Sequence, residues 1–519
     1  MVERFVYNGG RKMNKQIKEL IIFGGGTSGW LTASYLVKNL QSPCKITLIE
    51  DVSAGPIGVG EGTQPLTAKF LFECGIDPKR WMKPSNAAFK YGVELTGWND
   101  IPYFVDNDTP TNYMASQIDF INRYFHNQPY EEYAKWHPAY RLAKKNVSPK
   151  LETNLDVSFG IGPEGFGAVH FSAYDIIDTL KKIVGPKIIH VDAKIVQAKT
   201  NSEGISDLID DKGNTYTADL FLDCSGFKSA LLGKGVKSEF VSYKEQGWLL
   251  NDSAVAMPTQ YTNPQEECHP YTKATTMTSG WRWTIPTYKR IGNGYVYSSD
   301  FLSEEESEKE LRESVNDFET PVKHLKMRCG SHKEVAKKNV VGIGLAAGFI
   351  EPLEATGITF TTSLAKSVTD LLNLNGMNWD DKVRDFINQG FYEMSTEILA
   401  FVWSHYHFSK KDDTPYWKAI REQKLTDLPS DAQHIISQYW PKPKPFLFFS
   451  QQSMFTSIQW WSMIHAGGGY NTSISLSEKE KDYFEYFIKN TNNRIEMAEE
   501  LFPNHYEFLK EWYDEWKIS

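Results

Sequence analysis

Residues 24–30, which read Gly-Gly-Gly-Thr-Ser-Gly-Trp, have the composition of a turn that binds the phosphates of a dinucleotide. Small residues let the backbone approach a pyrophosphate closely, and the free amides of a following helix stabilise its negative charge. A carboxylate at the end of the next strand, such as that of Glu50, is placed to bind ribose hydroxyls. We therefore predict these cofactor-binding residues: Gly24, Gly26, Thr27, Ser28, Gly29 and Glu50.

The segments around this turn predict a βαβ unit. Residues 19–23 form a short apolar strand, residues 30–40 have apolar side chains at helical spacing, and residues 45–49 form a second strand. Two later segments, 216–227 and 339–349, read as buried strands that end in small residues, which favours FAD over a loosely held nicotinamide. These strand ends add three predicted cofactor contacts: Asp223, Gly348 and Phe349. We expect an α/β fold with a Rossmann-like FAD-binding domain of the flavin monooxygenase type.

A pair of tryptophans marks a second segment, residues 280–286, which reads Gly-Trp-Arg-Trp-Thr-Ile-Pro. Tryptophans separated by one residue point to the same face of an extended chain, and Pro286 prevents the segment from continuing as a helix. The pair predicts a rigid aromatic wall, which belongs either to the ordinary core or to the edge of a site.

The composition bounds the class of protein. The chain has 519 residues, 41% of them hydrophobic and 14% aromatic, which is enough for a large core and for pockets with aromatic walls. A net charge of −9 argues against nucleic-acid binding, and no apolar run approaches the ~20 residues of a membrane span. Five cysteines without a close pair fit neither a disulfide framework nor a metal site. We expect a cytoplasmic globular protein with no metal, no nucleic acid and no membrane partner, and leave a homo-oligomer open.

The organisation along the chain is discontinuous. Residues 1–17 read as an N-terminal extension and residues 18–386 as an FAD-binding core assembled from separated segments. Residues 387–519 predict an appended, mostly helical substrate-binding region that prolines interrupt. Residues 303–317 predict an acidic amphipathic helix, whereas residues 99–148 are polar and aromatic without a clear period.

Taken together, three motifs resemble those of the flavin-dependent halogenases, the tryptophan halogenase family. They are GxGxxGW at 24–30, WxWxIP at 281–286, and Glu-Pro-Leu-Glu-Ala-Thr-Gly-Ile at 351–358, and the resemblance extends over roughly residues 18–420. It implies reduced FAD supplied by a separate flavin reductase, O2 as oxidant, and a halide that attacks a flavin hydroperoxide to give hypohalous acid. The acid would then reach a small aromatic substrate through a tunnel. In this interpretation a barrier motif separates substrate from flavin: Trp281, Trp283, Ile285 and Pro286.

The resemblance also implies the catalytic residues, Lys90 and Glu354. Residues 87–95 alternate as one strand that places Lys90 opposite its apolar neighbours, where it can face a cavity. An ammonium there can hold and polarise hypohalous acid, and burial can lower its pKa enough for a haloamine to form instead; both roles stay open. Glu354 would orient the electrophile and accept the proton that the ring loses. The position of Ala355 carries Ser in several family members, which leaves fine adjustment of proton handling in question but not the reaction class.

The start of a helix near residue 356 predicts a halide site, because unpaired backbone amides at a helix start stabilise an anion. The candidates are Thr356 and Gly357. Bromide or iodide is favoured over chloride, because both are oxidised more easily.

The substrate region departs from the tryptophan-specific enzymes, whose loop after the lysine strand carries a histidine and a phenylalanine that clamp the indole. No histidine lies between residues 101 and 125 here. An electron-rich ring of the indole or phenol type is the expected substrate. The candidate rings are Tyr103, Phe104, Trp440, Trp460 and Trp461.

Two other functions remain open at this point. A flavin-dependent aromatic monooxygenase shares the FAD fold and the O2 chemistry, but needs its substrate next to the flavin. A non-catalytic flavin-binding relative would explain Ala355 and the altered substrate region.

Overall fold

The fold begins with the βαβ unit that the sequence predicts. β2 (Glu19–Phe23), α1 (Thr27–Asn39) and β3 (Lys45–Glu50) follow one another, and the two strands pair in parallel. Parallel pairing requires a crossover, which α1 supplies. The computed structural model describes residues 15–54, 61–107, 118–148, 167–441 and 453–515.

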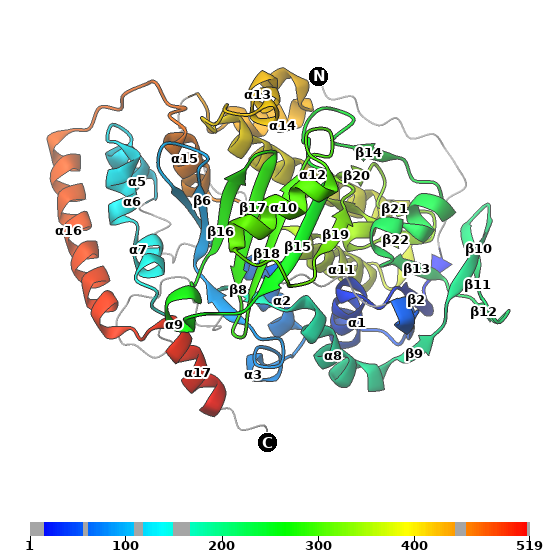
Figure 1. Cartoon of the computed structure of the whole chain (residues 1–519). Helices are drawn as coiled ribbons and strands as arrows, with labels where there is room; N and C mark the ends of the chain where they lie inside the picture. Colours follow the sequence, from blue (N-terminus) through cyan, green and yellow to red (C-terminus); the bar gives the residue numbers. More distant parts are fainter. Residues whose placement is uncertain (1–14, 55–60, 108–117, 149–166, 442–452, 516–519) are drawn as a thin grey trace.

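A six-stranded sheet extends this unit with segments from far along the chain, in the order β21-β22-β13-β2-β3-β9 (Figure 1). The two later strands predicted from the sequence are confirmed, because β13 pairs in parallel with both β2 and β22. The added strands are β9 (Ile189–Asp192), β13 (Leu220–Asp223), β21 (Ala336–Lys337) and β22 (Val340–Gly342). The helices that pack with α1 are α8 (Ala173–Val184) and α11 (Gly357–Leu374). The outer ribbon at the right of Figure 1 consists of β10 (Ile195–Asn201), β11 (Gly204–Asp210) and β12 (Thr215–Tyr216).

A seven-stranded sheet occupies the middle of the molecule, in the order β19-β15-β18-β17-β16-β6-β7 (Figure 1). The tryptophan pair lies on β17, which is hydrogen-bonded on both sides by its neighbours. The strands are β6 (Gly92–Thr96), β7 (Tyr103–Asp106), β15 (Ser253–Thr259), β16 (Thr272–Met277), β17 (Gly280–Pro286), β18 (Ile291–Tyr297) and β19 (Lys323–Lys326). The acidic helix predicted over 303–317 is α10 (Glu304–Val315), which packs on β15 and β18.

The segment predicted as one strand over residues 87–95 is two strands, and this prediction was wrong. β5 (Ala88–Lys90) joins a small sheet in the order β4-β8-β5, whereas β6 joins the large sheet. The chain changes sheets at Tyr91, whose amide donates to the carbonyl of Pro270 and whose carbonyl accepts from the amide of Asn107. The predicted alternation of faces therefore does not run through Tyr91. β5 pairs with β8 (Ala168–Phe171), which on its other side pairs with β4 (Glu61–Gly62).

The helices that follow the sheets are α12 (Asp381–His407), α13 (Pro415–Glu422), α14 (Ser430–Ser437), α15 (Ser457–Ala466), α16 (Glu478–Leu501) and α17 (His505–Glu515). The predicted boundary at residue 387 falls inside α12, which is unbroken. Helices from the first third of the chain join this region at the left of Figure 1, where α5 packs on α15 and α16 and α7 packs on α16. They are α5 (Ile118–Phe125), α6 (Tyr130–Trp136) and α7 (Pro138–Lys144), which the sequence pattern did not reveal.

Short elements complete the fold. The last three residues of the predicted N-terminal extension belong to the fold, because β1 (Lys15–Gln16) pairs with β24 (Asn378–Trp379) and Ile17 is buried. Residues 1–14 of the extension lie outside the described residues. A third small sheet has the order β14-β20-β23. The remaining elements are α2 (Pro65–Glu73), α3 (Pro78–Trp81), α9 (Pro264–Glu267), β14 (Phe240–Ser242), β20 (Gly330–His332) and β23 (Gly348–Phe349).

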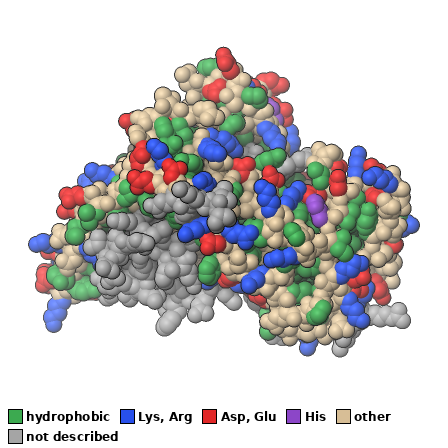
Figure 2. All heavy atoms as spheres, turned by 90° about the horizontal axis from the view of Figure 1, so that it is seen from below, with side chains coloured by type: hydrophobic (Ala, Val, Ile, Leu, Met, Phe, Trp, Pro, Cys, Tyr) green, Lys and Arg blue, Asp and Glu red, His purple; other side chains and the backbone are tan. Residues whose placement is uncertain are grey.

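The surface carries both signs of charge. Figure 2 shows basic and acidic side chains interspersed over the face seen from below. Within the described ranges, no helix is both long enough and apolar enough to cross a membrane.

Candidate active site

The glycine turn between β2 and α1 has the form of a phosphate cradle. Gly24 has a φ of 116°, and a Cβ there would collide with the carbonyl of Cys224 at the end of β13. A Cβ at Gly29 would collide with the carbonyl of Gly24. Gly26, by contrast, has no atom within 4 Å of its ideal Cβ position and is the residue before the first turn of α1. The backbone amides of this turn can therefore meet a pyrophosphate, as FAD requires.

Glu50 lies beside this turn, at the end of β3. Its Oε1 lies 2.9 Å from Nζ of Lys181 and 2.8 Å from Nε2 of His190. Its Oε2 faces Gly25, where a Cβ would collide with the carboxylate. One oxygen of Glu50 is thus paired with basic groups, while the other faces the turn where a ribose would follow the phosphates.

Two other predicted cofactor residues, Asp223 and Phe349, have different surroundings. The carboxylate of Asp223 is fully buried and accepts from the amides of Ser225, Leu231 and Leu232, at 2.8 to 3.0 Å. It therefore holds its own loop, which is a structural use that we did not predict for it. Phe349 lies next to the start of α11, because the ideal Cβ of Gly357 would be 3.7 Å from its ring.

Ser28 and Thr27 continue the cradle into α1. The hydroxyl of Ser28 lies 2.8 Å from that of Thr361 in α11, and the hydroxyl of Thr27 donates to the carbonyl of Ala173 at 3.4 Å. The turn is therefore tied to the two helices that flank α1.

Lys90 is buried at the end of β5, with 4% of its surface exposed. Its ammonium donates to the carbonyl of Thr63 at 3.1 Å. Burial lowers the pKa of Lys90 to about 8, against the opposing effect of the negative charge of Glu354. Lys90 is therefore enclosed and does not lie on an exposed strand face.

Glu354 lies in a 3-10 turn, Pro352–Glu354, that leads into α11. Its side chain is fully buried, and its backbone carbonyl accepts from Nε2 of Gln64 at 2.6 Å. Asn107 in turn donates to Gln64 at 3.0 Å. The next residue, Ala355, has a φ of 55°, so the chain turns sharply before the helix. Within the described residues, neither carboxylate oxygen of Glu354 has a hydrogen-bond partner.

His405 is the neighbour of Glu354 that sequence reasoning missed. Its Nε2 lies 3.1 Å from Oε1 of Glu354, and both side chains have no exposed surface. Its Nδ1 lies 2.7 Å from the hydroxyl of Tyr103. The three side chains form a buried row, and the contact between His405 and Glu354 is not aligned as a hydrogen bond.

Thr356 and Gly357 lie at the start of α11, as predicted. Helix starts leave amides without intrahelical partners, and α11 has 18 residues. The hydroxyl of Thr356 is buried and, within the part of the chain described, has no hydrogen-bond partner. These groups fit a halide, which needs donors and little space.

The two tryptophans of the barrier motif are both buried. Their ring centroids on β17 are 6.3 Å apart, and the rings are inclined by 61°. Trp281 donates through Nε1 to Glu351 at 2.9 Å. The carbonyl of Pro286, at the other end of β17, accepts from Nδ1 of His170 at 2.8 Å. Burial and the positive charge of Lys90 hold the pKa of His170 well below its usual range, so this ring is neutral.

The five predicted substrate rings do not lie together. Tyr103 contacts His405, but Phe104, on the opposite face of β7, stacks on Tyr140 in a separate apolar cluster. Of these two candidate rings, Tyr103 is therefore the one that lies beside His405.

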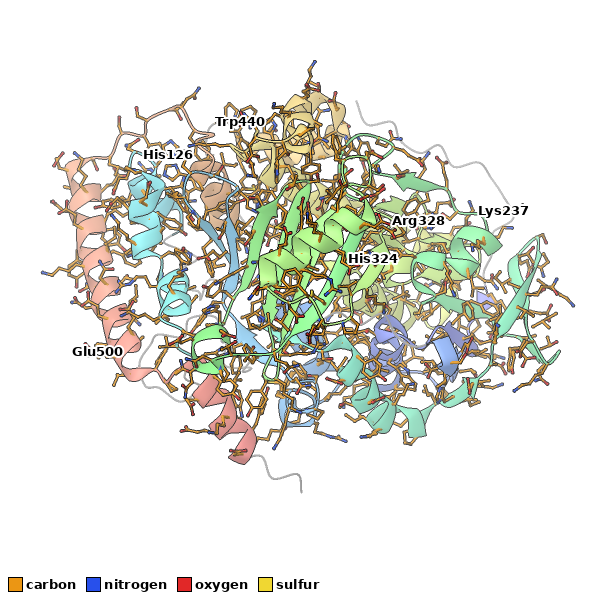
Figure 3. The ribbon with its side chains drawn as sticks, viewed as in Figure 1. His126, Lys237, His324, Arg328, Trp440 and Glu500 are labelled. Carbon is orange, nitrogen blue, oxygen red and sulfur yellow. The ribbon has the colours of Figure 1, made fainter. Side chains whose placement is uncertain are left out.

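The three C-terminal tryptophans also diverge. Trp460 packs on Phe401, whose ring lies 4.9 Å from that of His405. Trp461 instead stacks on His465, at 4.7 Å. Trp440 packs on Phe408 and donates to the carbonyl of Gly469; Figure 3 shows it near the helices at the top of the view. Of the three, Trp460 is the one joined by ring contacts to the neighbourhood of Glu354.

Comparison with known proteins gives a consistent result. A family model described as tryptophan halogenase matches residues 19–477. The tryptophan 7-halogenase of Lentzea aerocolonigenes is 31% identical over 441 residues, which cover 80% of this chain and 81% of that one. The 7-chloro-L-tryptophan 6-halogenase of Kutzneria sp. (strain 744) is 28% identical over 514 residues, covering 94% and 98%. The solved tryptophan 6-halogenase of Streptomyces toxytricini has a TM-score of 0.82 and 27% identity, covering 96% of this chain and 100% of that one.

The chain belongs to the tryptophan halogenase family. It is an enzyme, a flavin-dependent halogenase of aromatic compounds, and its mixed α/β fold is that of the family. The family implies FAD, O2 and a halide. Among the described residues of this halogenase, no group of three or more histidines, cysteines, aspartates or glutamates is arranged to hold a metal ion.

The glycines of the halogenase give a test of the cofactor site. Gly26→Ala meets no atom within 4 Å, so we expect a normal fold with FAD affinity reduced about tenfold or more, because a methyl group would displace the phosphates. Gly29→Ala meets backbone, so we expect a lower melting temperature together with lost FAD binding. Thermal unfolding and fluorescence titration with FAD measure both. Unchanged affinity in Gly26→Ala would contradict the assignment.

Proposed function

We propose that this halogenase uses Lys90 and Glu354 to transfer an oxidised halogen to a small electron-rich aromatic of the indole or phenol type. The observation that carries the proposal is that both groups are enclosed, beside the start of α11, with Lys90 at a pKa of about 8. Two ionisable groups removed from water at one place are typical of catalytic sites. A separate flavin reductase would supply reduced FAD, and the cytoplasm is the expected compartment.

The cradle at residues 24–29 fits the phosphates of FAD, with Glu50 beside it for the ribose and Phe349 near α11. When bound and reduced, FAD would activate O2 so that a halide is oxidised to hypohalous acid. Thr356 and Gly357 would hold the halide through their helix-start groups. Gly348, which precedes Phe349 in β23, completes the proposed cofactor wall.

Lys90 would hold the oxidised halogen. Its ammonium is a compact donor in an enclosed place, where a hydrogen bond polarises its acceptor more strongly than in water. A pKa of about 8 also makes the neutral amine accessible near neutral pH, which a haloamine would need. The lowered pKa therefore supports either role.

Glu354 would accept the proton that leaves the ring after halogen transfer. Its carboxylate oxygens are without hydrogen-bond partners among the described residues, so they are chemically available. His405, whose Nε2 lies 3.1 Å from Oε1, would keep the carboxylate directed. The hydroxyl of Tyr103 would in turn orient the imidazole.

Trp281 and Trp283 would exclude the substrate from the flavin. Both rings are held in the middle of the large sheet, where neighbouring strands limit their movement. A monooxygenase would need its substrate in contact with the flavin, so this barrier supports halogenation over ring hydroxylation.

The substrate is proposed to be an indole or phenol other than free tryptophan. The relatives named above act on tryptophan or chlorotryptophan. This chain lacks a histidine between residues 101 and 125, and its aromatic side chains near Glu354 come from Tyr103, Phe401 and Trp460.

Replacing Lys90 tests the catalytic assignment. In Lys90→Met we expect at least about a hundredfold lower product formation, because the donor is lost while the volume is kept. FAD affinity should stay within about twofold, since the hydrogen bond of Lys90 is to the carbonyl of Thr63 and the glycine cradle is a separate segment of the described fold. Liquid chromatography of halogenated indoles and FAD titration measure the two. Product formation by the variant at the wild-type rate would contradict the role, and so would equal loss of FAD binding.

The lowered pKa of Lys90 predicts opposite effects of pH on activity and stability. If the ammonium is the active form, the rate falls as pH rises through about 8. In the unfolded chain Lys90 has its ordinary pKa of 10.5, so between pH 8 and 10.5 the unfolded state keeps a proton that the folded state loses. The free energy of unfolding therefore rises with pH over this window. Rate profiles and denaturation at pH 7 to 10 check both effects. Lys90→Met should lack the stability increment, and a rate that rises through pH 8 would favour the amine.

Halide competition tests which halide is preferred. With equal chloride, bromide and iodide and a panel of indoles and phenols, we expect brominated and iodinated products to dominate, because these halides are oxidised more easily. Mass spectrometry of the products gives the ratio. Mainly chlorinated product would refute the preference, and hydroxylated product without halide would instead support a monooxygenase.

A further inference from the structure

A second buried acid, Glu351, lies three residues before Glu354. Its Oε2 accepts three hydrogen bonds, from Nε1 of Trp281 at 2.9 Å, the hydroxyl of Tyr406 at 2.5 Å and Nδ2 of Asn251 at 2.8 Å. The four side chains have between 0% and 1% of their surface exposed. We call this group the Glu351 cluster.

The donors of the Glu351 cluster come from three separate parts of the fold. Trp281 lies on β17, Tyr406 lies near the end of α12, and Asn251 precedes β15. Asn251 also donates to the hydroxyl of Tyr406 at 2.9 Å. One carboxylate oxygen therefore fixes the barrier strand, a helix of the C-terminal region and the loop that carries Glu354 relative to one another.

The Glu351 cluster and the contact between His405 and Glu354 share the same helix and the same loop. Successive residues of α12, His405 and Tyr406, meet two acids of one loop: His405 lies next to Glu354, and Tyr406 donates to Glu351. A shift of the loop along α12 would break both contacts together. The hydrogen bond at Glu351 thus sets the position of the contact at Glu354.

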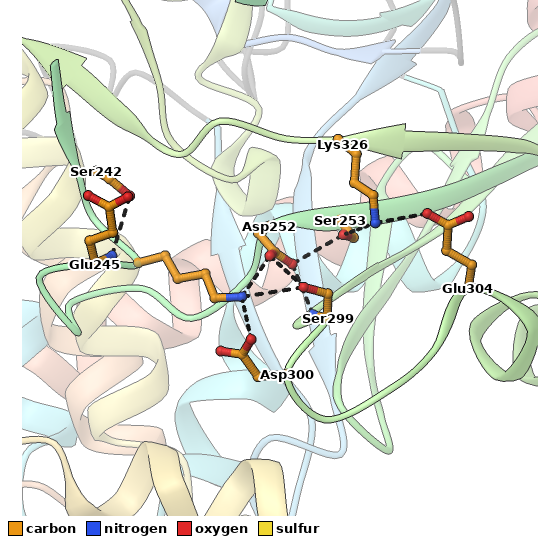
Figure 4. Close-up of polar contacts among 9 residues, drawn as sticks. Ser242, Glu245, Asp252, Ser253, Ser299, Asp300, Glu304 and Lys326 are labelled. Atoms are coloured by element: carbon orange, nitrogen blue, oxygen red, sulfur yellow. Dashed lines mark hydrogen bonds and ion pairs between the residues drawn. The ribbon is translucent and has the colours of Figure 1, made fainter.

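The third donor, Asn251, is held in place by the contacts of its neighbour Asp252. Asp252 follows Asn251, and its carboxylate accepts from Lys244 and from Ser299. Figure 4 shows Asp252 beside Ser299 and Asp300. Lys244 lies 2.6 Å from Asp252 and 2.9 Å from Asp300. Asn251 therefore points into the core from an anchored loop, which favours a fixed position over a mobile one.

The chemistry of the cluster argues for specificity of position. A buried carboxyl is costly unless donors satisfy it, and each donor left unpaired in the core adds its own penalty. Burial raises the pKa of Glu351, and the donated hydrogen bonds oppose the shift. The favourable arrangement is therefore one in which all three donors reach the carboxylate; here they reach Oε2, and Oε1 has no hydrogen-bond partner among the described residues.

We propose that Glu351 is a positioning residue, which holds Trp281 and the Glu354 loop in the one register that lets the barrier and the catalytic acid act together. The proposal rests on the proposed function for the roles of Trp281 and Glu354. Glu351 itself would contact neither halogen nor substrate.

Four variants test the proposal. Glu351→Leu removes the acceptor and keeps the volume, whereas Glu351→Gln keeps an acceptor oxygen. Trp281→Phe removes one donor and keeps an aromatic ring. Tyr406→Phe removes a second donor by deleting only the hydroxyl oxygen, so the test remains possible if Glu351→Leu does not fold. Asp210→Asn is the matched control, because Asp210 is also a buried acid, 3% exposed, that accepts from a tyrosine and from backbone amides in the outer β-ribbon.

Single turnovers with enzyme in excess of reduced FAD measure the yield of halogenated product and of hypohalous acid released to a trapping reagent. We expect Glu351→Leu to lower the product yield about tenfold and to raise the released acid, with Glu351→Gln recovering most of the yield. The losses from Glu351→Leu and Trp281→Phe should not multiply when the two are combined, because both remove the same contact. Multiplying losses, or wild-type yield in Glu351→Leu and Tyr406→Phe, would overturn the proposal.

Crystal structures of the wild type, Glu351→Leu and Tyr406→Phe test the positioning without any assay. We expect Trp281 and Glu354 to be displaced by about 1 Å, a distance large enough to impair catalysis. Variant structures that superimpose on the wild type at both residues would overturn the proposal. Absence of halogenated product from the wild type would instead refute the proposed function and leave the displacement as the deciding result for Glu351.

Discussion

The enclosure of charged groups is the constraint on which this site depends. Lys90 and Glu354 are both buried, and loss of either charge would leave the other in the core without its counter-charge. An isolated buried charge is unstable, so the fold must bring the two to one place and keep them there. Strand β5, the turn before α11 and helix α12 all contribute to that place, although they are far apart in the sequence.

Long-range topology explains how these segments meet. The chain leaves one sheet after Lys90 and enters another at Gly92, so the lysine stands at the junction of two sheets. Neutral His170 bridges the same junction, from β8 to the end of β17. The barrier strand is thus hydrogen-bonded, through a neutral group, to β8, the strand that pairs with the lysine strand β5.

The sequence predicts the parts of this structure that local rules determine. The glycine turn, its flanking strands and the start of α11 follow from residue type and spacing, since each is formed within a few neighbouring residues. The break at Tyr91 was missed because the hydrogen bonds that cause it come from Pro270 and Asn107. His405 carries no local motif, and only the packing of α12 brings it to Glu354. The amides of the following loop donate to Asp223, a contact that its strand-end position does not indicate, and its contact with the cofactor stays a prediction.

Two acids in one short loop have different environments, and this difference separates their roles. Oε2 of Glu351 accepts from three neutral donors and has little capacity left for a reacting group, whereas its Oε1 has no hydrogen-bond partner among the described residues. Glu354 is equally buried, but its carboxylate oxygens have no hydrogen-bond partner among the residues that the structure describes. Residue type alone does not distinguish a structural carboxylate from a reactive one; the count of donors around each does. The acid with three donors fixes the loop, and the acid without donors is held by that loop next to His405.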